Sequence, residues 1–246
     1  MPVMKVGPGR ALLGGGGNYN DLVIGTGPLA WYQADAITGL VDGNAVVTWL
    51  DSSGNGYHVT QAVGAQQPTY RIGIQNGLPA VRFDGGDWLA NLAFSDFPDS
   101  CSIYVAATHT VTNTVLVEIT DVAGGINTGF TLFNEANDER FRVCGPILTD
   151  EVAQVITPPV TGLFGGIYAA TVRQNIYING VLEDDIGSTA GALANVLGRI
   201  YVGSFTGGAG YQLQGDIFEI LIYTAAHNDT QRQQAEAYLN WKWALY

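Results

Sequence analysis

The sequence predicts an all-β protein with two packed antiparallel sheets and one short C-terminal helix. The chain holds 33 glycines in 246 residues beside many Val, Ile, Tyr and Thr, which is typical of short strands joined by tight turns. Strand-like runs bounded by turn residues recur along most of the chain. No alternation of strand and helix patterns and no long internal repeat is present, so an α/β or a repeat architecture is not expected.

Ten runs carry the strand signal, and their short links favour antiparallel neighbours. The stretch IYINGVLE places Asn179 and Gly180 between two strand-like segments, which is a strong hairpin signal because both residues tolerate positive φ. The runs are AVVTWL, AVRF, SIYVAAT, VLVEIT, GFTLFN, RFRV, GIYAATV, NIYI, RIYVG and DIFEILIY.

A helix is predicted for residues 229–242, within the stretch HNDTQRQQAEAYLNWKW. Asn228, Asp229 and Thr230 are each able to cap its first turn, and Thr230 with Gln233 fits the spacing of a capping box. The helix would therefore begin close to these residues and close the domain.

Aromatic residues near both ends indicate where the core lies. Tyr238 falls at helical spacing with other apolar residues and should face the sandwich. Trp31 and Trp49 are expected in the core, and Trp241 and Trp243 are expected to pin the helix.

Residues 1–28 differ from the rest, because they are Gly-rich and show no periodicity. We interpret them as an N-terminal arm or linker, and residues 29–246 as one sandwich domain. The arm holds too little apolar surface to offset the ordering entropy of its backbone, so it should order only against a neighbouring chain. A leader without a role is the alternative. The apolar run at 11–13 is too short for a secretory signal, which predicts synthesis in a cytoplasm.

The composition excludes several partners. The formal net charge of −12 leaves no basic patch to neutralise phosphates, so nucleic acid and anionic membrane surfaces are not expected partners. Cys101 and Cys144 each lie in a strand-like run, and either one disulfide or two buried thiols fits that placement. No zinc-ligand spacing is present.

The order of the motifs carries a resemblance. A Trp strand leads into DSSGNGYHVTQ, followed by QPTYR, GLPAVRFDGGDWL, CSIYVAAT, YINGVLE, IYVGS, GDIFEILIYT and AEAYLNWKW. This series resembles the laminin-G-like, concanavalin A-like lectin/glucanase domains found in bacteriophage virion and bacterial surface proteins, and it covers about residues 29–246. The resemblance implies a jelly-roll sandwich. It does not fix a function, because the fold hosts lectins, hydrolases and structural modules.

The loop after Trp49 permits two interpretations. Asp51 and Asn55 sit where an EF-hand-like calcium loop places oxygen ligands, but Ala62 stands where the bidentate acid belongs. The alternative is a tight corner in which Asp51 accepts hydrogen bonds from nearby backbone N–H groups. Calcium at the sandwich rim is implied by the resemblance, so Ca²⁺ is a candidate cofactor. The candidate ligands are Asp51, Asn55, Asp84 and Asp87.

Catalysis is not expected. Glucanases of the resembling family use the pattern E-x-D-x-x-E on one strand, and the chain has no match to it. Glu118 and Asp121 are three positions apart, as are Asp216 and Glu219, so each pair should point to opposite faces of a regular strand. No nucleophile elbow is present either.

Sugar binding is the remaining site chemistry. Lectin sites stack a sugar face on an exposed aromatic ring and bind hydroxyls with polar groups. The candidate contacts lie in or beside Gly-rich loops, and local packing is the competing explanation for each. They are Tyr57, His58, Trp88 and Tyr211.

Two functions fit these features. The first is a non-enzymatic structural or adhesive virion protein of a tailed bacteriophage, such as a decoration, fibre or tail-associated subunit with a lectin-like domain. It would contact other virion subunits through residues 1–28, bind a cell-surface glycan and form a homo-oligomer or a larger assembly. The alternative is a carbohydrate-binding module of a bacterial surface or secreted protein, which would be extracellular.

Overall fold

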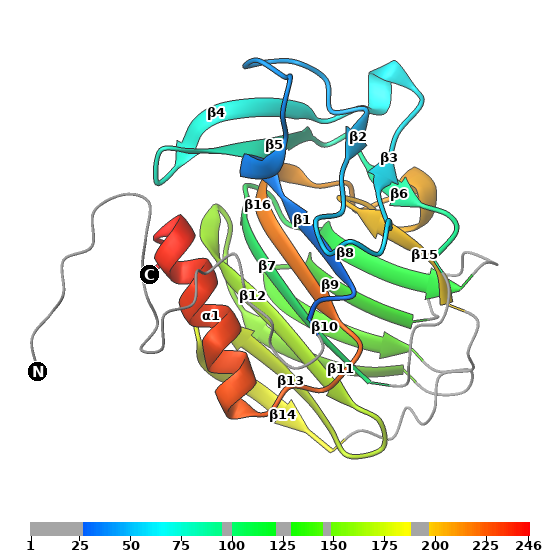
Figure 1. The fold of residues 1–246 in the computed structure, drawn as a ribbon. Helices are drawn as coiled ribbons and strands as arrows, with labels where there is room; N and C mark the ends of the chain where they lie inside the picture. Colours follow the sequence, from blue (N-terminus) through cyan, green and yellow to red (C-terminus); the bar gives the residue numbers. More distant parts are fainter. Residues whose placement is uncertain (1–26, 95–99, 122–128, 145–148, 188–196) are drawn as a thin grey trace, which may run out of the picture.

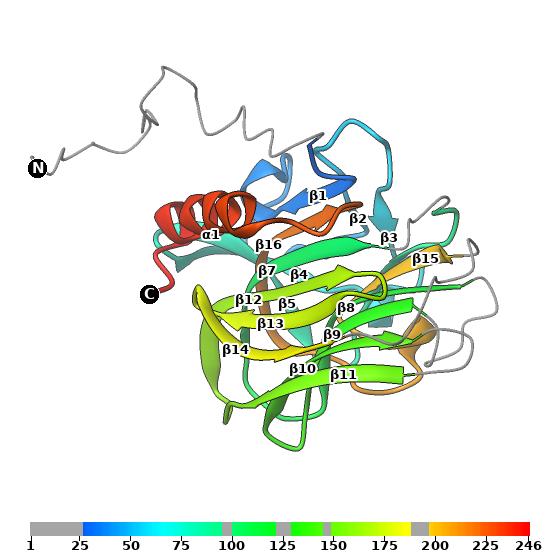
Figure 2. The ribbon, with the colours of Figure 1, turned by 90° about the horizontal axis from the view of Figure 1, so that it is seen from below.

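The computed structural model describes residues 27–94, 100–121, 129–144, 149–187 and 197–246. These residues form two antiparallel sheets packed face to face, with the helix α1 (Asp229–Trp243) on the outer face of one sheet (Figures 1 and 2). The predicted all-β sandwich with a C-terminal helix is confirmed. The division at residue 28 stays a prediction, and residues 1–26 lie outside the described part of the chain.

We call the sheet that carries α1 the helix-side sheet and the other one the opposite sheet. The helix-side sheet has the order β14 (Val181–Ile186), β13 (Arg173–Ile178), β12 (Val160–Ala169), β7 (Cys101–His109), β16 (Gln214–Tyr223), β5 (Leu78–Asp84), β4 (Thr69–Gln75), with β1 (Ala30–Gln33) also paired to β16. The opposite sheet has the order β11 (Thr149–Val155), β10 (Asp138–Cys144), β9 (Gly129–Glu135), β8 (Thr114–Asp121), β15 (Leu197–Val202), β6 (Leu89–Asn91), β3 (Val59–Thr60), β2 (Thr48–Trp49). Short 3₁₀ turns lie in the connections, at η2 (Ala34–Ala36), η3 (Gly64–Gln66) and η4 (Thr206–Gly208).

Strand β16 runs along the middle of the helix-side sheet. It pairs with β7 on one side, and on the other side with β5 through its first half and β1 through its second half. Its register against β7 shifts between Ile217 and Glu219. Asp216 therefore pairs with Thr108 and Glu219 with Ala106, two positions along β7, so both acids face the same side of the sheet. The prediction of opposite faces is wrong for this pair because of the bulge.

The carboxylate of Glu219 anchors the C-terminal helix. It accepts hydrogen bonds from the Tyr238 hydroxyl at 2.7 Å and the Trp243 indole N–H at 2.7 Å, and its Oε2 lies 2.8 Å from the Lys242 ammonium. It also accepts from the indole N–H of Trp31 on β1, at 2.5 Å. Glu219 is fully buried, so these four donors replace the water that an ionised carboxylate requires.

Asn228, one of the three predicted caps, is the N-cap of α1, but the capping box differs from the predicted one. The capping box is formed by Asn228 and Gln231, because Asn228 accepts from the Gln231 N–H and the Gln231 side chain accepts from the Asn228 N–H. The predicted box at Thr230 and Gln233 is wrong by two positions, since the helix begins at Asp229 rather than after Thr230.

Most of the expected core residues are buried. Trp49 is fully buried, and Trp31 and Tyr238 are nearly so. Trp243 is buried and stacks on Phe218 with ring centroids 5.4 Å apart. Trp241 is 45% exposed and so lies outside the buried core, and its role in pinning the helix stays a prediction.

Smaller predictions are also decided. Cys101 is a buried free thiol, so the disulfide alternative does not occur, while the side chain of Cys144 lies outside the described part. Asn179 and Gly180 have positive φ and join β13 to β14, as the hairpin signal predicts.

Gly166 on β12 leaves room for Phe141 of the opposite sheet, whose ring lies 2.5 Å from where a Cβ would be. No described helix has the length and apolar character needed to cross a bilayer.

Candidate functional site

The corner after β2 is built around the Asp51 carboxylate. Its Oδ1 accepts from the N–H groups of Trp31 and Ser53, both at 2.9 Å. Its Oδ2 accepts from the Ser53 hydroxyl at 2.8 Å and the Tyr57 N–H at 3.0 Å. Asp51 is only 7% exposed. The prediction that it forms a corner with the Ser53 backbone is confirmed, and the same carboxylate also ties the corner to β1.

Two more polar residues hold this corner. The Asn55 side chain donates to the Leu29 carbonyl at 2.9 Å. The Asp51 N–H donates to Nδ1 of His58 at 2.9 Å, so the neutral imidazole carries its proton on Nε2. His58 is exposed, whereas the ring of Tyr57 packs edge-on against Phe94 with centroids 4.7 Å apart. The corner is therefore rigid and offers His58 to solvent.

A pocket of about 370 Å³ lies beside the corner, between the segment after β1 and the segment around β2. That volume falls within the roughly 300–1,000 Å³ of small-ligand pockets. Its lining combines aliphatic side chains with hydroxyl and amide groups. The lining residues are Gln33, Ala36, Ile37, Thr38, Leu40, Ala45, Val47, Thr48, Trp49, Leu50, Asp51 and Ser52.

Buried aromatic residues of the core fix the backbone that forms this pocket. The buried indole of Trp49 donates to the Gln33 carbonyl at 3.0 Å and packs on Tyr32 with ring centroids 5.9 Å apart. The Tyr32 hydroxyl in turn donates to the Tyr57 carbonyl at 2.5 Å. In contrast, Val47 and Leu50 are 51% and 58% exposed, so the rim is open and partly apolar.

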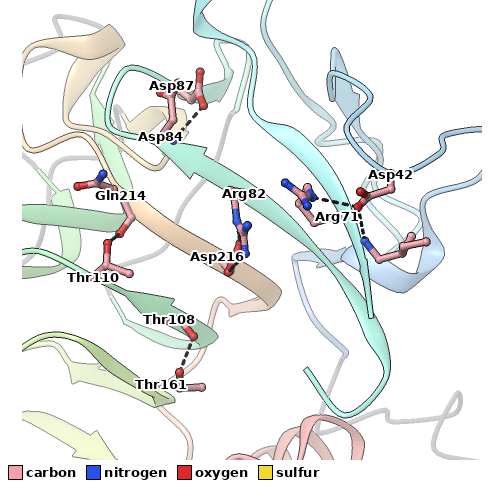
Figure 3. A network of polar contacts seen from close by, with 11 residues as sticks. Asp42, Arg71, Arg82, Asp84, Asp87, Thr108, Thr110, Thr161, Gln214 and Asp216 are labelled. Atoms are coloured by element: carbon pink, nitrogen blue, oxygen red, sulfur yellow. Dashed lines mark hydrogen bonds and ion pairs between the residues drawn. The ribbon is translucent and has the colours of Figure 1, made fainter. Parts of the chain in front are cut away.

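The candidate calcium ligands fall into two pairs. Asp51 and Asn55 belong to the corner beside Trp31, whereas Asp84 and Asp87 form a turn at the end of β5 (Figure 3). Trp31 pairs with Leu221 and Asp84 with Gln214 of β16, so the two pairs lie roughly 20 Å apart at about 3.3 Å per strand residue.

The turn of Asp84 and Asp87 places two acids together. The Asp84 N–H donates to Asp87 at 3.0 Å, and Asp84 accepts from the Gly86 N–H at 2.9 Å. Burial, with the adjacent Asp84 carboxylate, raises the pKa of Asp87 to about 6. Among the described residues no three His, Cys, Asp or Glu side chains gather as a metal site would need. Calcium binding at either pair stays a prediction.

The four sugar-contact candidates lie in three different places, and none is among the residues described as lining the pocket. Tyr57 and His58 belong to the corner. Trp88 is half-buried 6.0 Å from the ring of Tyr201, and its indole N–H has no hydrogen-bond partner within the part of the chain that the structure describes. Tyr211 lies in the connection between η4 and β16, where its ring packs on that of Phe205. Sugar contact by these four residues stays a prediction.

Tyr211 shows how local packing accounts for such a residue. Its hydroxyl donates to Glu135 at 2.5 Å, which raises the pKa of Tyr211 together with partial burial. Its ring lies 5.1 Å from that of Phe205 and 6.4 Å from that of Phe133. These contacts close a small apolar cluster over β8 and β9.

Three of the four acids considered for catalysis are engaged structurally. Asp216 forms a bidentate pair with Arg82, with both distances 2.8 Å (Figure 3). Glu219 anchors the helix. Glu118 accepts from the Thr206 N–H at 2.7 Å beneath η4, and burial raises the pKa of its carboxyl to about 7. Nothing is described of the Asp121 side chain.

The comparisons with known proteins place the fold. No protein-family model and no curated protein matches the chain. The receptor-binding domain of botulinum neurotoxin type G matches with a TM-score of 0.56 and 13% identity, over 79% of this chain and 51% of that one. A botulinum neurotoxin serotype D ligand-binding domain in complex with N-acetylneuraminic acid matches with a TM-score of 0.57 and 12% identity, over 86% of this chain and 50% of that one.

A smaller domain matches over most of its length. The CBM40 of the Ruminococcus gnavus IT-sialidase, bound to α2,3-sialyllactose, has a TM-score of 0.50 and 12% identity, over 62% of this chain and 92% of that one. The chain spans about half the length of the neurotoxin domains it matches. At these identities the likeness shows the fold alone, a β-sandwich shared with these binding domains.

Sequence reasoning found the corner but missed the pocket beside it. The lining from Ala36 to Leu40 reads AITGL, which has neither strand nor helix periodicity and no acid pair or aromatic. Only Asp51 among the predicted site residues lines the pocket. The turn residues of this segment mark it as a loop, but which cavity a loop borders depends on the tertiary fold.

Proposed function

We propose that the chain is a non-enzymatic, lectin-like glycan-binding module whose sugar site is the pocket beside the Asp51 corner. The observation that carries this proposal is the pocket itself. The corner and the buried Trp49 hold the walls of the pocket in place. The exposed hydroxyls of Thr38, Thr48 and Ser52 line the pocket. Hydroxyl and amide groups set among aliphatic side chains match the polar edges and C–H faces of a sugar ring.

The absence of enzymatic activity is part of this proposal. A glycosidase of this fold needs two carboxyl groups facing a substrate cleft. Asp216 and Glu219 share one face, but Arg82 holds the first and α1 covers the second. The neighbouring solved structures that are described as binding domains support a binding role rather than a catalytic one.

A glycan array with the purified protein tests the proposal. Ala45→Trp should fill the pocket and abolish array binding, because Ala45 lines it. Val172→Trp adds the same ring at a 67% exposed position on the turn after β12 and should leave binding unchanged. Equal glycan binding by the wild type and Ala45→Trp would mean that the sugar site lies elsewhere. If the wild type bound no glycan, the proposed glycan-binding function would be refuted.

The location of the module and the subunits to which it is attached are a separate, more specific proposal. We place the module on a bacteriophage virion, attached to other virion subunits through residues 1–28, with a bacterial surface or secreted protein as the alternative. The resemblance to laminin-G-like virion domains and the Gly-rich composition of residues 1–28 support this setting. Mass spectrometry of gradient-purified particles and of the cell-surface fraction separates the two: recovery only from cells would refute the virion setting.

A further inference from the structure

We infer that the pocket selects neutral sugars and rejects sialylated ones, unlike the sialylated ligand named for the Ruminococcus gnavus domain of similar fold. This inference rests on the proposed glycan-binding function and specifies its ligand class. It comes from the charges that line and surround the pocket.

Within the part of the chain that the structure describes, twelve residues line the pocket, and none of them is Lys, Arg or His. The one ionisable residue among them is Asp51, whose carboxylate lies beside the pocket and accepts hydrogen bonds from four donors. A sialic acid carboxylate entering this pocket would lose water without meeting a cation, and it would be repelled by Asp51.

Two cations beside the pocket, both among the described residues, are already paired with carboxylates. Lys242 contacts Gln33, which lines the pocket, at 3.0 Å, but its ammonium lies 2.8 Å from both Asp35 and Glu219. Two carboxylates therefore surround one ammonium, and the Lys242 side chain is only 10% exposed. The local charge stays negative on this side of the pocket.

On the side of β4 the cation is also paired with a carboxylate. Arg71 forms its ion pair with Asp42 at 2.9 Å, and Asp42 also accepts from the Ile72 N–H at 3.0 Å (Figure 3). The net charge of −12 adds a long-range repulsion of anions. Neutral polyols suffer none of these penalties, since the Gln33 amide and the exposed Thr and Ser hydroxyls neither require nor repel charge.

The experiment compares neutral glycans with their sialylated counterparts. An array carries neutral oligosaccharides beside the same oligosaccharides with a terminal sialic acid, lactose and α2,3-sialyllactose among them. Neutral glycans that bind are then titrated by calorimetry together with their sialylated forms. We expect each sialylated form to bind at least ten-fold more weakly than its neutral counterpart.

A variant that adds a positive charge tests whether the lack of a cation causes the preference for neutral sugars. Leu50→Arg places a cation on the exposed rim and should narrow the ten-fold gap, whereas Val172→Arg adds the same charge far from the pocket and should not. Equal or stronger binding of sialylated forms to the wild type would overturn the inference and leave the glycan-binding function standing. The inference would also be overturned if Leu50→Arg left the affinity ratio between neutral and sialylated glycans unchanged. Failure of every glycan to bind would instead refute the proposed function.

Discussion

Replacing Glu219 with Ala should destabilise the domain more than any other single loss of charge described above. The substitution removes the acceptor of the Trp31, Tyr238 and Trp243 donors and one of the two carboxylates that neutralise Lys242. Removing one partner of a buried, hydrogen-bonded charge costs about 3–5 kcal/mol. For a domain of this size 1 kcal/mol corresponds to roughly 2–4 °C, so the melting temperature should fall by about 6–20 °C.

Differential scanning calorimetry measures that fall, and Asp185→Ala is the matched control. Asp185 is an exposed acid on the edge strand β14, so its loss should change the melting temperature by less than about 2 °C. Circular dichroism of Glu219→Ala should show a folded protein at low temperature, because the sandwich interior is untouched. A melting temperature within 2 °C of the wild type would refute the role of Glu219 as the helix anchor.

Three further predictions concern other buried polar groups. Asp51→Ala strands the N–H groups that its carboxylate binds and should cost about 2–4 kcal/mol in urea unfolding, more than the loss of one cap. Because burial raises the pKa of Glu118 from 4.5 to about 7, the folded state holds a proton that the unfolded chain releases above pH 4.5. Glu118 should therefore lower stability by about 3 kcal/mol as pH rises from 4.5 past 7, and Glu118→Gln should remove this contribution from melts across that range. His109 and Glu139 pair across the interior at 3.2 Å, both fully buried. Either single change to Ala should cost about 3–5 kcal/mol, while joint replacement by apolar residues should cost less than the two losses added.

The fold was predictable because its signals are local. Alternating apolar residues, turn dipeptides such as Asn179-Gly180 and the polar residues before the helix each report on a few neighbouring positions. Trp49 could be placed in the core for the same reason, since it ends an apolar run. The errors arose where tertiary contacts decide. The bulge at Ile217 and Glu219 turns both strand acids outward, and the residue spacing alone shows no bulge.

The site was less predictable because it is assembled from residues with ordinary chemistry. Asp51 could be recognised as a corner residue from the following Ser and Gly residues. Its second task, accepting from the Trp31 N–H twenty positions earlier, has no signal in the loop sequence. The exposed residues Val47 and Leu50 look like strand residues in the run AVVTWL, and only the shortness of β2 leaves them on the rim of the pocket.

The two edges of the sandwich are closed in different ways. At one edge β11 of the opposite sheet lies against β13 and β14 of the helix-side sheet. At the other edge β2 and β3 are two residues long each, and they cannot supply the ladder bonds that the chain around them needs. Side chains supply those bonds instead: Asp51 and Asn55 hold the corner to β1, and the Trp49 indole holds Gln33. Since these bonds go to the backbone, they fix the path of the chain whatever exposed side chains it carries. Exposed substitutions in the segment 36–52 should therefore change the ligand with little effect on stability, because each costs about 0.5 kcal/mol or less.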